Sequence, residues 1–138
     1  MANEIAKAKK GLAAALSGID GLRVFGYAPE SLHEFPAAIV RMESRESVET
    51  LGGGAVRGSL CVEVLVSGAD AKQAAETLYE FVEPLGARSI ETAANSDSTW
   101  GGSVDDGRLV SVDRIGRRNV AGVNCVGAQF HFWFVKSW

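Results

Sequence analysis

Every second residue is apolar over a long stretch near the C-terminal end of this 138-residue chain. Between residues 123 and 135, the alternate positions Val126, Ala128, Phe130, Phe132 and Phe134 are apolar. Successive side chains of a strand point to opposite faces of a sheet, so this spacing predicts a strand with one buried face. Gln129, His131 and Trp133 fall on the other face. The chain must therefore build a sheet that has other elements packed against one side.

Residues 59–67 show the same period, with Leu60, Val62, Val64 and Val66 on one face. Shorter strands are predicted at 22–27, 37–42 and 108–115, followed by a turn or bulge at 116–119. Helical spacing of apolar residues predicts helices at 3–18 and 71–85, with a short helix at 89–94. Asp70 is the expected N-cap of the second helix, and Pro84 and Gly86 mark its end.

These elements follow one another with short links, which favours antiparallel pairing. The predicted fold is an α+β domain, with an antiparallel or mixed sheet of about five strands and helices packed on one face. The 138 residues, of which 46% are hydrophobic and 22% charged, fit a single domain that spans the whole chain.

The segment 43–58 differs from its surroundings because charged residues alternate there with small ones, and three glycines follow at 52–54. It predicts a long hairpin arm or a mobile loop that buries no face of its own. A phosphate-binding loop is disfavoured, since a dinucleotide fingerprint would need glycine where Arg57 stands and a P-loop would need lysine where Ser59 stands. We therefore expect removal of residues 44–57 to leave the domain folded.

Charge and cysteine content exclude several functional classes. The net charge is −3 and the basic residues are scattered, which disfavours a primary nucleic-acid binder. No apolar stretch approaches the length of a membrane span. Cys61 and Cys125 lie in apolar runs without C-x-x-C spacing, so both are expected to be buried free thiols.

The sequence contains no recognised spacing of catalytic or metal-binding residues. We therefore expect neither an enzyme nor a cofactor or metal site. Asp97, Asp105 and Asp106 share a loop, but the ligand spacing of a calcium loop is absent, so a solvated acidic loop is expected. His33 and His131 have no partner residues in a recognisable catalytic pattern.

Large aromatic and basic side chains are the candidates for an interface with other polypeptides. Trp100 stands in a polar loop, Trp133 is out of phase with the apolar face, and Trp138 ends the chain. Exposed tryptophans are common anchors of interfaces, although each could instead pack under its own loop. The further candidates are Arg114, Arg117 and Arg118 near a strand turn, and Arg45, Val48, Leu51 and Arg57 in the arm. The three arginines near the strand turn could instead be solvated residues of that turn, without a role in an interface.

The layout resembles the tail terminator proteins of long-tailed phages and related prophage or gene-transfer particles. The resemblance covers most of the chain: a first helix leading to Gly21-Leu22-Arg23-Val24-Phe25-Gly26-Tyr27-Ala28-Pro29, then Phe35-Pro36-Ala37-Ala38-Ile39-Val40, the charged arm, Leu60-Cys61-Val62-Glu63-Val64-Leu65-Val66-Ser67, the helix from Asp70, and two last strands.

This resemblance implies a structural virion protein that forms a ring, expected to be a hexamer, at the top of the tail tube. Its expected partners are further copies of itself, the tail-tube protein and the head–tail connector or stopper protein, with DNA passing through the lumen without specific binding. It implies assembly in the host cytoplasm, no cofactor and no catalysis. Two alternatives stay open. One is another neck, head–tail joining or tail-tube protein. The other is a small-ligand-binding α+β domain with a deep pocket near His131 or His33.

Overall fold

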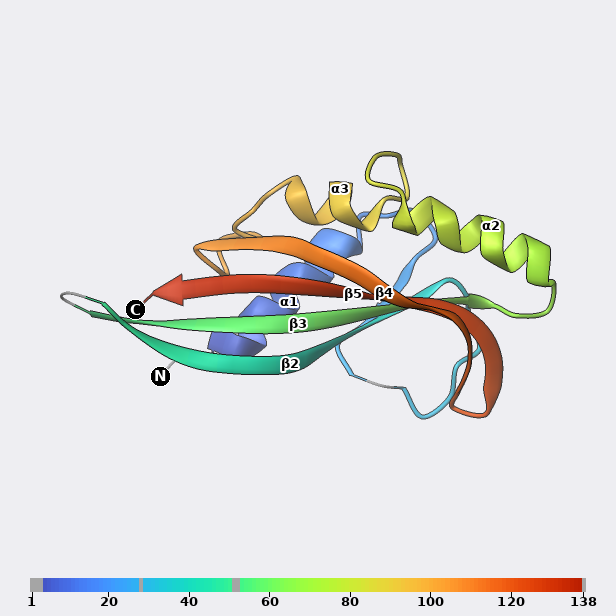
Figure 1. The fold of residues 1–138 in the computed structure, drawn as a ribbon, viewed down its shortest axis with the longest axis horizontal. Helices are drawn as coiled ribbons and strands as arrows, with labels where there is room; N and C mark the ends of the chain where they lie inside the picture. The colour runs from blue at the N-terminus through green and yellow to red at the C-terminus, as the bar shows by residue number, and fades with distance from the viewer. Residues whose placement is uncertain (1–3, 28, 51–52, 138) are drawn as a thin grey trace.

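The computed structural model describes residues 4–27, 29–50 and 53–137 (Figure 1). The elements in chain order are α1 (Glu4–Leu16), β1 (Arg23–Phe25), β2 (Ala37–Thr50), β3 (Gly53–Ser67), α2 (Ala71–Val82), α3 (Ile90–Asn95), β4 (Asp106–Val120) and β5 (Val123–Ser137). The strands form a five-stranded sheet in the order β1-β2-β3-β5-β4. β1 runs parallel to β2 and the other neighbours are antiparallel, so the sheet is mixed. The predicted α+β fold is confirmed.

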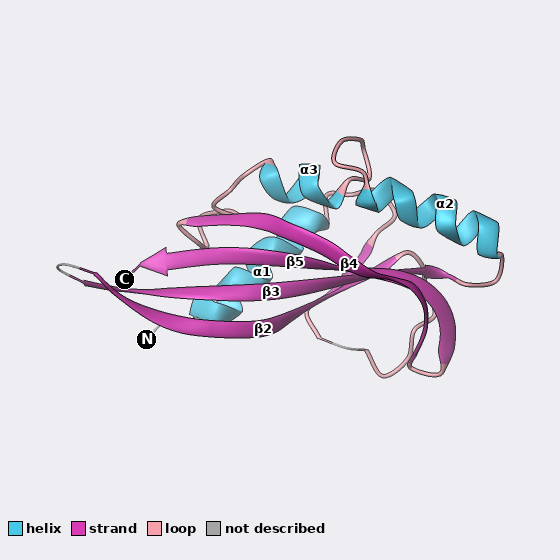
Figure 2. Cartoon of the chain, in the orientation of Figure 1, coloured by secondary structure: helices cyan, strands magenta, loops and turns pink. Residues whose placement is uncertain are grey.

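The three helices pack against one face of the sheet, which carries the core (Figure 2). Their buried residues include Leu12 and Leu16 from α1, Leu78 and Phe81 from α2, and Ile90 from α3. The sheet contributes the predicted apolar rows, namely Leu60, Val62, Val64 and Val66 from β3, and Val126, Ala128, Phe130, Phe132 and Phe134 from β5. Burial of these rows is the main source of stability, because apolar surface is removed from water.

Helix α2 begins where predicted and ends earlier. The Asp70 carboxylate accepts a hydrogen bond from the Gln73 N–H at 3.1 Å, which caps the first turn. The helix ends at Val82, whereas the predicted helix ran to Leu85. Leu85 is 81% exposed, so its apolar side chain is not part of the buried stripe. Pro84 explains the early end, because the residue before a proline is driven away from helical backbone.

The last two strands form a hairpin that is longer than predicted. A turn or a bulge is expected at 116–119, and the prediction of a turn there is wrong. The chain reverses direction at Ala121 and Gly122, both of which have positive φ. An irregularity does interrupt the ladder just before this segment, between Asp113 and Gly116. After it, β4 continues to Val120 (Figure 1).

The segment 43–58 is a hairpin arm in its described part, not a mobile loop. β2 and β3 stay in register from Ser44 opposite Ser59 to Thr50 opposite Gly53. The expectation that this arm buries nothing is wrong, because Ala55 is 5% and Val56 4% exposed. Residues 55–58 also pair with β5, so removal of 44–57 would take away part of the sheet and core.

The two long hairpins extend from opposite ends of the sheet (Figure 1). The β2–β3 hairpin projects on the side where the N- and C-termini lie. The β4–β5 hairpin bends away from the helices at the other end. No helix in the described ranges is long and apolar enough to cross a membrane.

Candidate functional site

The face of the sheet opposite the helices carries most of the polar clusters of the molecule. We call it the open face and define it by residues 57, 59, 61 and 63 of β3, residues 129, 131 and 133 of β5, and their cross-strand neighbours in β2 and β4. One end of this side of the sheet is covered by Leu32 and Phe35 from the loop before β2, which pack with Ala37, Ile39, Leu65 and Cys125. The rest is available for polar contacts.

His131 lies at the centre of the open face, directly opposite Cys61 in the β3–β5 register. Its Nδ1 lies 2.9 Å from Oε1 of Glu43, and its Nε2 lies 2.7 Å from Oδ1 of Asp113. Glu43 occupies the irregularity in β2 between Met42 and Ser44. Such a bulge re-aims a side chain that a regular strand would place elsewhere.

The two carboxylates raise the pKa of His131 above its usual 6.5, through the hydrogen bond to Glu43 first and that to Asp113 second. Burial acts in the opposite sense, since it disfavours the charged ring. Burial also raises the pKa of the Cys61 thiol to about 11. At neutral pH the thiol therefore keeps its proton and lacks the thiolate character of a nucleophile.

Glu63 forms a second cluster beside the first. Its carboxylate pairs with Arg41 at 3.4 Å and more closely with Arg118. The Arg118 side chain is only 17% exposed, and its guanidinium also donates to the carbonyl of Gly127 at 3.1 Å. This arrangement joins β2, β3 and β4 across the sheet.

Trp133 lies near the C-terminal end of β5 with two guanidinium groups near its ring. The guanidinium carbon of Arg108 is 5.1 Å, and that of Arg57 6.0 Å, from the ring centroid. Arg57 also pairs with Glu46 at 3.2 Å. The structure therefore brings together two of the predicted interface residues, Arg57 and Trp133, and adds Arg108, which the sequence did not single out.

The prediction that Trp100 is an exposed interface anchor is wrong. Its side chain is 1% exposed and packs at 6.0 Å, edge to face, on Phe132. Gly107 lies beneath the indole, since a Cβ there would come within 2.7 Å of three ring carbons. The loop that carries Trp100 folds back over the sheet, so this tryptophan fills the chain's own core.

The prediction that Arg118 belongs to an interface is wrong as well. Its guanidinium bonds within the chain to the Glu63 carboxylate and to the Gly127 carbonyl. Arg114 and Arg117 are exposed, as is Arg45 in the arm. Arg117 stands opposite Val126, roughly 24 Å along β5 from Trp133, so the predicted interface residues form two separate groups. The structure describes the backbone of Val48, which lies in β2, but not its side chain. The predicted interface residues Leu51 and Trp138 lie outside the described residues.

The three aspartates expected in one loop are all exposed, and two of them, which precede β4, bond to backbone N–H groups. Asp97 accepts hydrogen bonds from the Thr99 hydroxyl and from the backbone N–H groups of Gly101 and Thr99, and these bonds, the hydroxyl's first, lower its pKa. Asp105 accepts from the hydroxyl and backbone N–H of Ser137, which lowers its pKa too. Asp106 begins β4.

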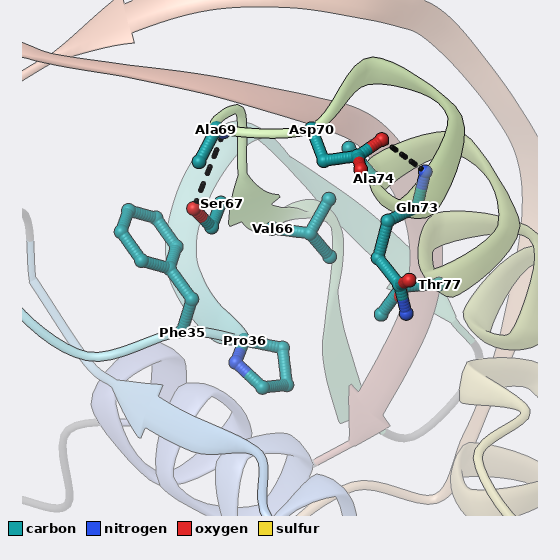
Figure 3. Close-up of a pocket in the computed structure, with 9 residues that line it drawn as sticks. All are labelled: Phe35, Pro36, Val66, Ser67, Ala69, Asp70, Gln73, Ala74 and Thr77. Carbon is teal, nitrogen blue, oxygen red and sulfur yellow. Dashed lines mark hydrogen bonds between the residues drawn. The ribbon is translucent and has the colours of Figure 1, made fainter.

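A hollow of about 240 Å³ lies between the start of α2 and the Phe35-Pro36 loop (Figure 3). Two of the polar side chains drawn there bond locally: Asp70 caps α2, and the Ser67 hydroxyl accepts from the Ala69 N–H at 3.4 Å. His33 lines a different surface hollow, beside β1. The polar groups around His131 converge on a sheet face, not within either of these hollows.

The sequence analysis missed Glu43, Asp113 and Glu63 as members of polar clusters. These residues lie far apart in the chain and meet only through strand register and two bulges. The available signal was the out-of-phase face of the two predicted apolar strands, where Cys61, Glu63 and His131 already shared one side.

Models of known protein families give no match to this chain, and neither do curated proteins.

Proposed function

We propose that this chain is a structural ring subunit of a long-tailed phage, of the tail terminator kind, which caps the tail tube and joins it to the head connector. It works by docking onto further copies of itself, and its surfaces support such docking better than small-molecule chemistry. The observation that carries the proposal is the edge strand β4, which exposes apolar side chains along a sheet edge that has no strand beyond it in the described ranges.

Two apolar side chains stand out on β4. Val110 is 64% and Ile115 51% exposed. Each lies at an irregularity of the β4–β5 ladder, between Leu109 and Ser111 or between Asp113 and Gly116. The bulges prevent a neighbouring strand from adding along the whole edge, so a partner would contact side chains there.

The opposite edge of the sheet offers a different surface. β1 pairs with only the first three residues of β2, Ala37 to Ile39, so the rest of β2 is an edge in the part of the chain that is described. β2 carries three glutamates and two arginines, whereas β4 carries three arginines and two aspartates besides Arg118, which pairs with Glu63 within the chain. An acidic edge that docks on a basic edge of the next copy is a heterologous contact, and such contacts form a ring when the rotation between copies closes.

Two of the predicted interface residues are engaged within the chain and are not available for docking. Trp100 and Arg118 contribute to the monomer and leave the proposed interface. The remaining candidates are the β4 edge with Arg114 and Arg117, the hairpin arm with Arg45, and the Trp133 group.

The test is the oligomeric state and shape of the purified protein. We expect native mass spectrometry to give a closed oligomer and negative-stain electron micrographs to show rings. When tail-tube protein polymerises in its presence, rings should cap tubes at one end. A protein that forms tubes by itself would be a tube subunit, and a protein that stays monomeric both alone and with tube protein would overturn the proposal.

A further inference from the structure

We propose that Glu43, Cys61 and His131 form a binding site for a divalent transition metal of the zinc class on the open face. The three residues come from β2, β3 and β5 and meet because the sheet register brings them together. This site is independent of the ring proposal, since it rests on side chains within one chain.

The geometry of the three donors is close to what such a metal needs. One ligand atom from each residue lies within 4.8 Å of the others. Metal–ligand distances of about 2.0–2.3 Å in a tetrahedron place the donor atoms roughly 3.3–3.8 Å apart. The Nδ1–Oε1 distance of 2.9 Å is shorter than this spacing, so the His131 and Glu43 donors must move apart slightly to take a metal between them.

The donor set selects the metal. A thiolate, an imidazole and a carboxylate together suit Zn²⁺ or Co²⁺, whereas Mg²⁺ and Ca²⁺ prefer oxygen donors alone. Three protein ligands leave a fourth tetrahedral position for water or for a group from outside the chain. Because Glu43 is exposed, that position has access to solvent.

Asp113 supplies the contact that metal-bound histidines characteristically have. Its Oδ1 lies 2.7 Å from Nε2 of His131, so it accepts the Nε2–H and fixes the ring with Nδ1 toward Glu43. A carboxylate in this place orients the imidazole and increases its basicity. On binding, the metal takes the place of the proton between Nδ1 and Glu43 and that of the Cys61 thiol, and both protons leave to solvent.

The alternative is a charged His131 that simply bridges two carboxylates, with Cys61 as an inert neighbour. The two interpretations differ in the role of the Cys61 sulfur. The metal site needs it as a ligand, whereas the bridge from His131 to Glu43 and Asp113 does not involve it. The chain offers a matched control in Cys125, which is as buried as Cys61 but has its Sγ 3.6 Å from the Arg118 carbonyl.

The test is a Co²⁺ titration of the full chain under a non-thiol reductant, followed by absorption. We expect a saturable thiolate-to-cobalt band at one equivalent in the wild type and in C125S, its removal by Zn²⁺, and its loss in C61S and H131Q. D113N should keep the band with affinity lowered about 10- to 100-fold, while E46Q, an exposed carboxylate outside the cluster, should change nothing.

Absence of the band from the wild type at millimolar Co²⁺ would overturn the proposal, and so would a band that survives in C61S. Circular dichroism establishes that each variant is folded. As a second readout, Zn²⁺ should raise the unfolding temperature of the wild type and C125S but not of C61S. Equal shifts in all three would mean that the metal binds elsewhere.

Discussion

The indole of Trp100 lies against Gly107 so closely that the glycine cannot be replaced without displacing the ring. A Cβ at position 107 would fall 2.7 Å from Cε2 and Cη2 of that indole. Trp100 in turn contacts Phe132 and Phe134 from β5. The loop before β4 is thereby fastened to the main core.

We expect Gly107→Ala to lower the free energy of unfolding by about 1–3 kcal/mol, because the added methyl overpacks a filled site. Urea denaturation followed by tryptophan fluorescence measures this loss. Gly26→Ala is the matched control, because no atom lies within 4 Å of the position its Cβ would take. If both variants lose the same stability, the close contact at Gly107 is not the cause.

Trp100 shows where sequence reasoning stops. The alternating rows of β3 and β5 are local patterns, and they identified the core face and the fold class correctly. The burial of Trp100 depends on a loop that folds back over β5, and no periodic signal exists in such a loop. The same holds for Glu43 and Asp113, which reach His131 only through strand register and bulges.

Arg118 and Glu63 form an ion pair that is mostly shielded from water, with side chains 17% and 12% exposed. We expect Arg118→Ala to cost about 1–3 kcal/mol, since it leaves the Glu63 carboxylate with a weaker partner in Arg41. A double-mutant cycle with Glu63→Gln should show non-additive losses. Arg23→Ala is the control, because its pair with Glu34 is about 60% exposed on both sides and contributes under about 1 kcal/mol.

His131 gives the metal-free protein a defined pH dependence. Glu43 and Asp113 raise its pKa in the folded state above the 6.5 of the unfolded chain. The stabilising contribution of the charged ring is therefore complete below pH 6.5 and is lost as the pH rises through the folded pKa. Denaturation series from pH 5 to 9 with a chelator present should show this decline.

Substitution of the acidic partner checks the cause of that decline. Asp113→Asn should lower the pKa of His131, as followed by NMR of the imidazole protons, and should flatten the pH dependence of stability. An unchanged imidazole pKa in this variant would contradict the assigned role of Asp113.

The tip of the β2–β3 hairpin is expected to serve assembly, not folding. Val48 stands directly opposite Ala55, so an Asn-Gly turn can replace residues 49–54 without loss of the buried Ala55 and Val56. We expect the trimmed protein to unfold at a temperature close to that of the wild type while its oligomer weakens. A trimmed protein that assembles fully would remove the tip of the arm from the proposed interface and would leave Arg45 as its remaining candidate.

The exposed pair on β4 gives the sharpest test of the ring interface. Val110→Asp combined with Ile115→Asp places charge on an edge that we expect a neighbouring copy to cover, and desolvation of those charges opposes docking. Sedimentation velocity should give a dissociation constant of the oligomer at least about tenfold higher than that of the wild type, which corresponds to a loss of roughly 1.4 kcal/mol of association free energy. Both side chains are more than half exposed in the monomer, so its unfolding temperature should change little. Leu85→Asp is the control, because Leu85 is 81% exposed but follows α2 and belongs to no strand. If Leu85→Asp dissociates the oligomer and the β4 double variant does not, the interface lies on the helical side and the edge-to-edge arrangement is wrong.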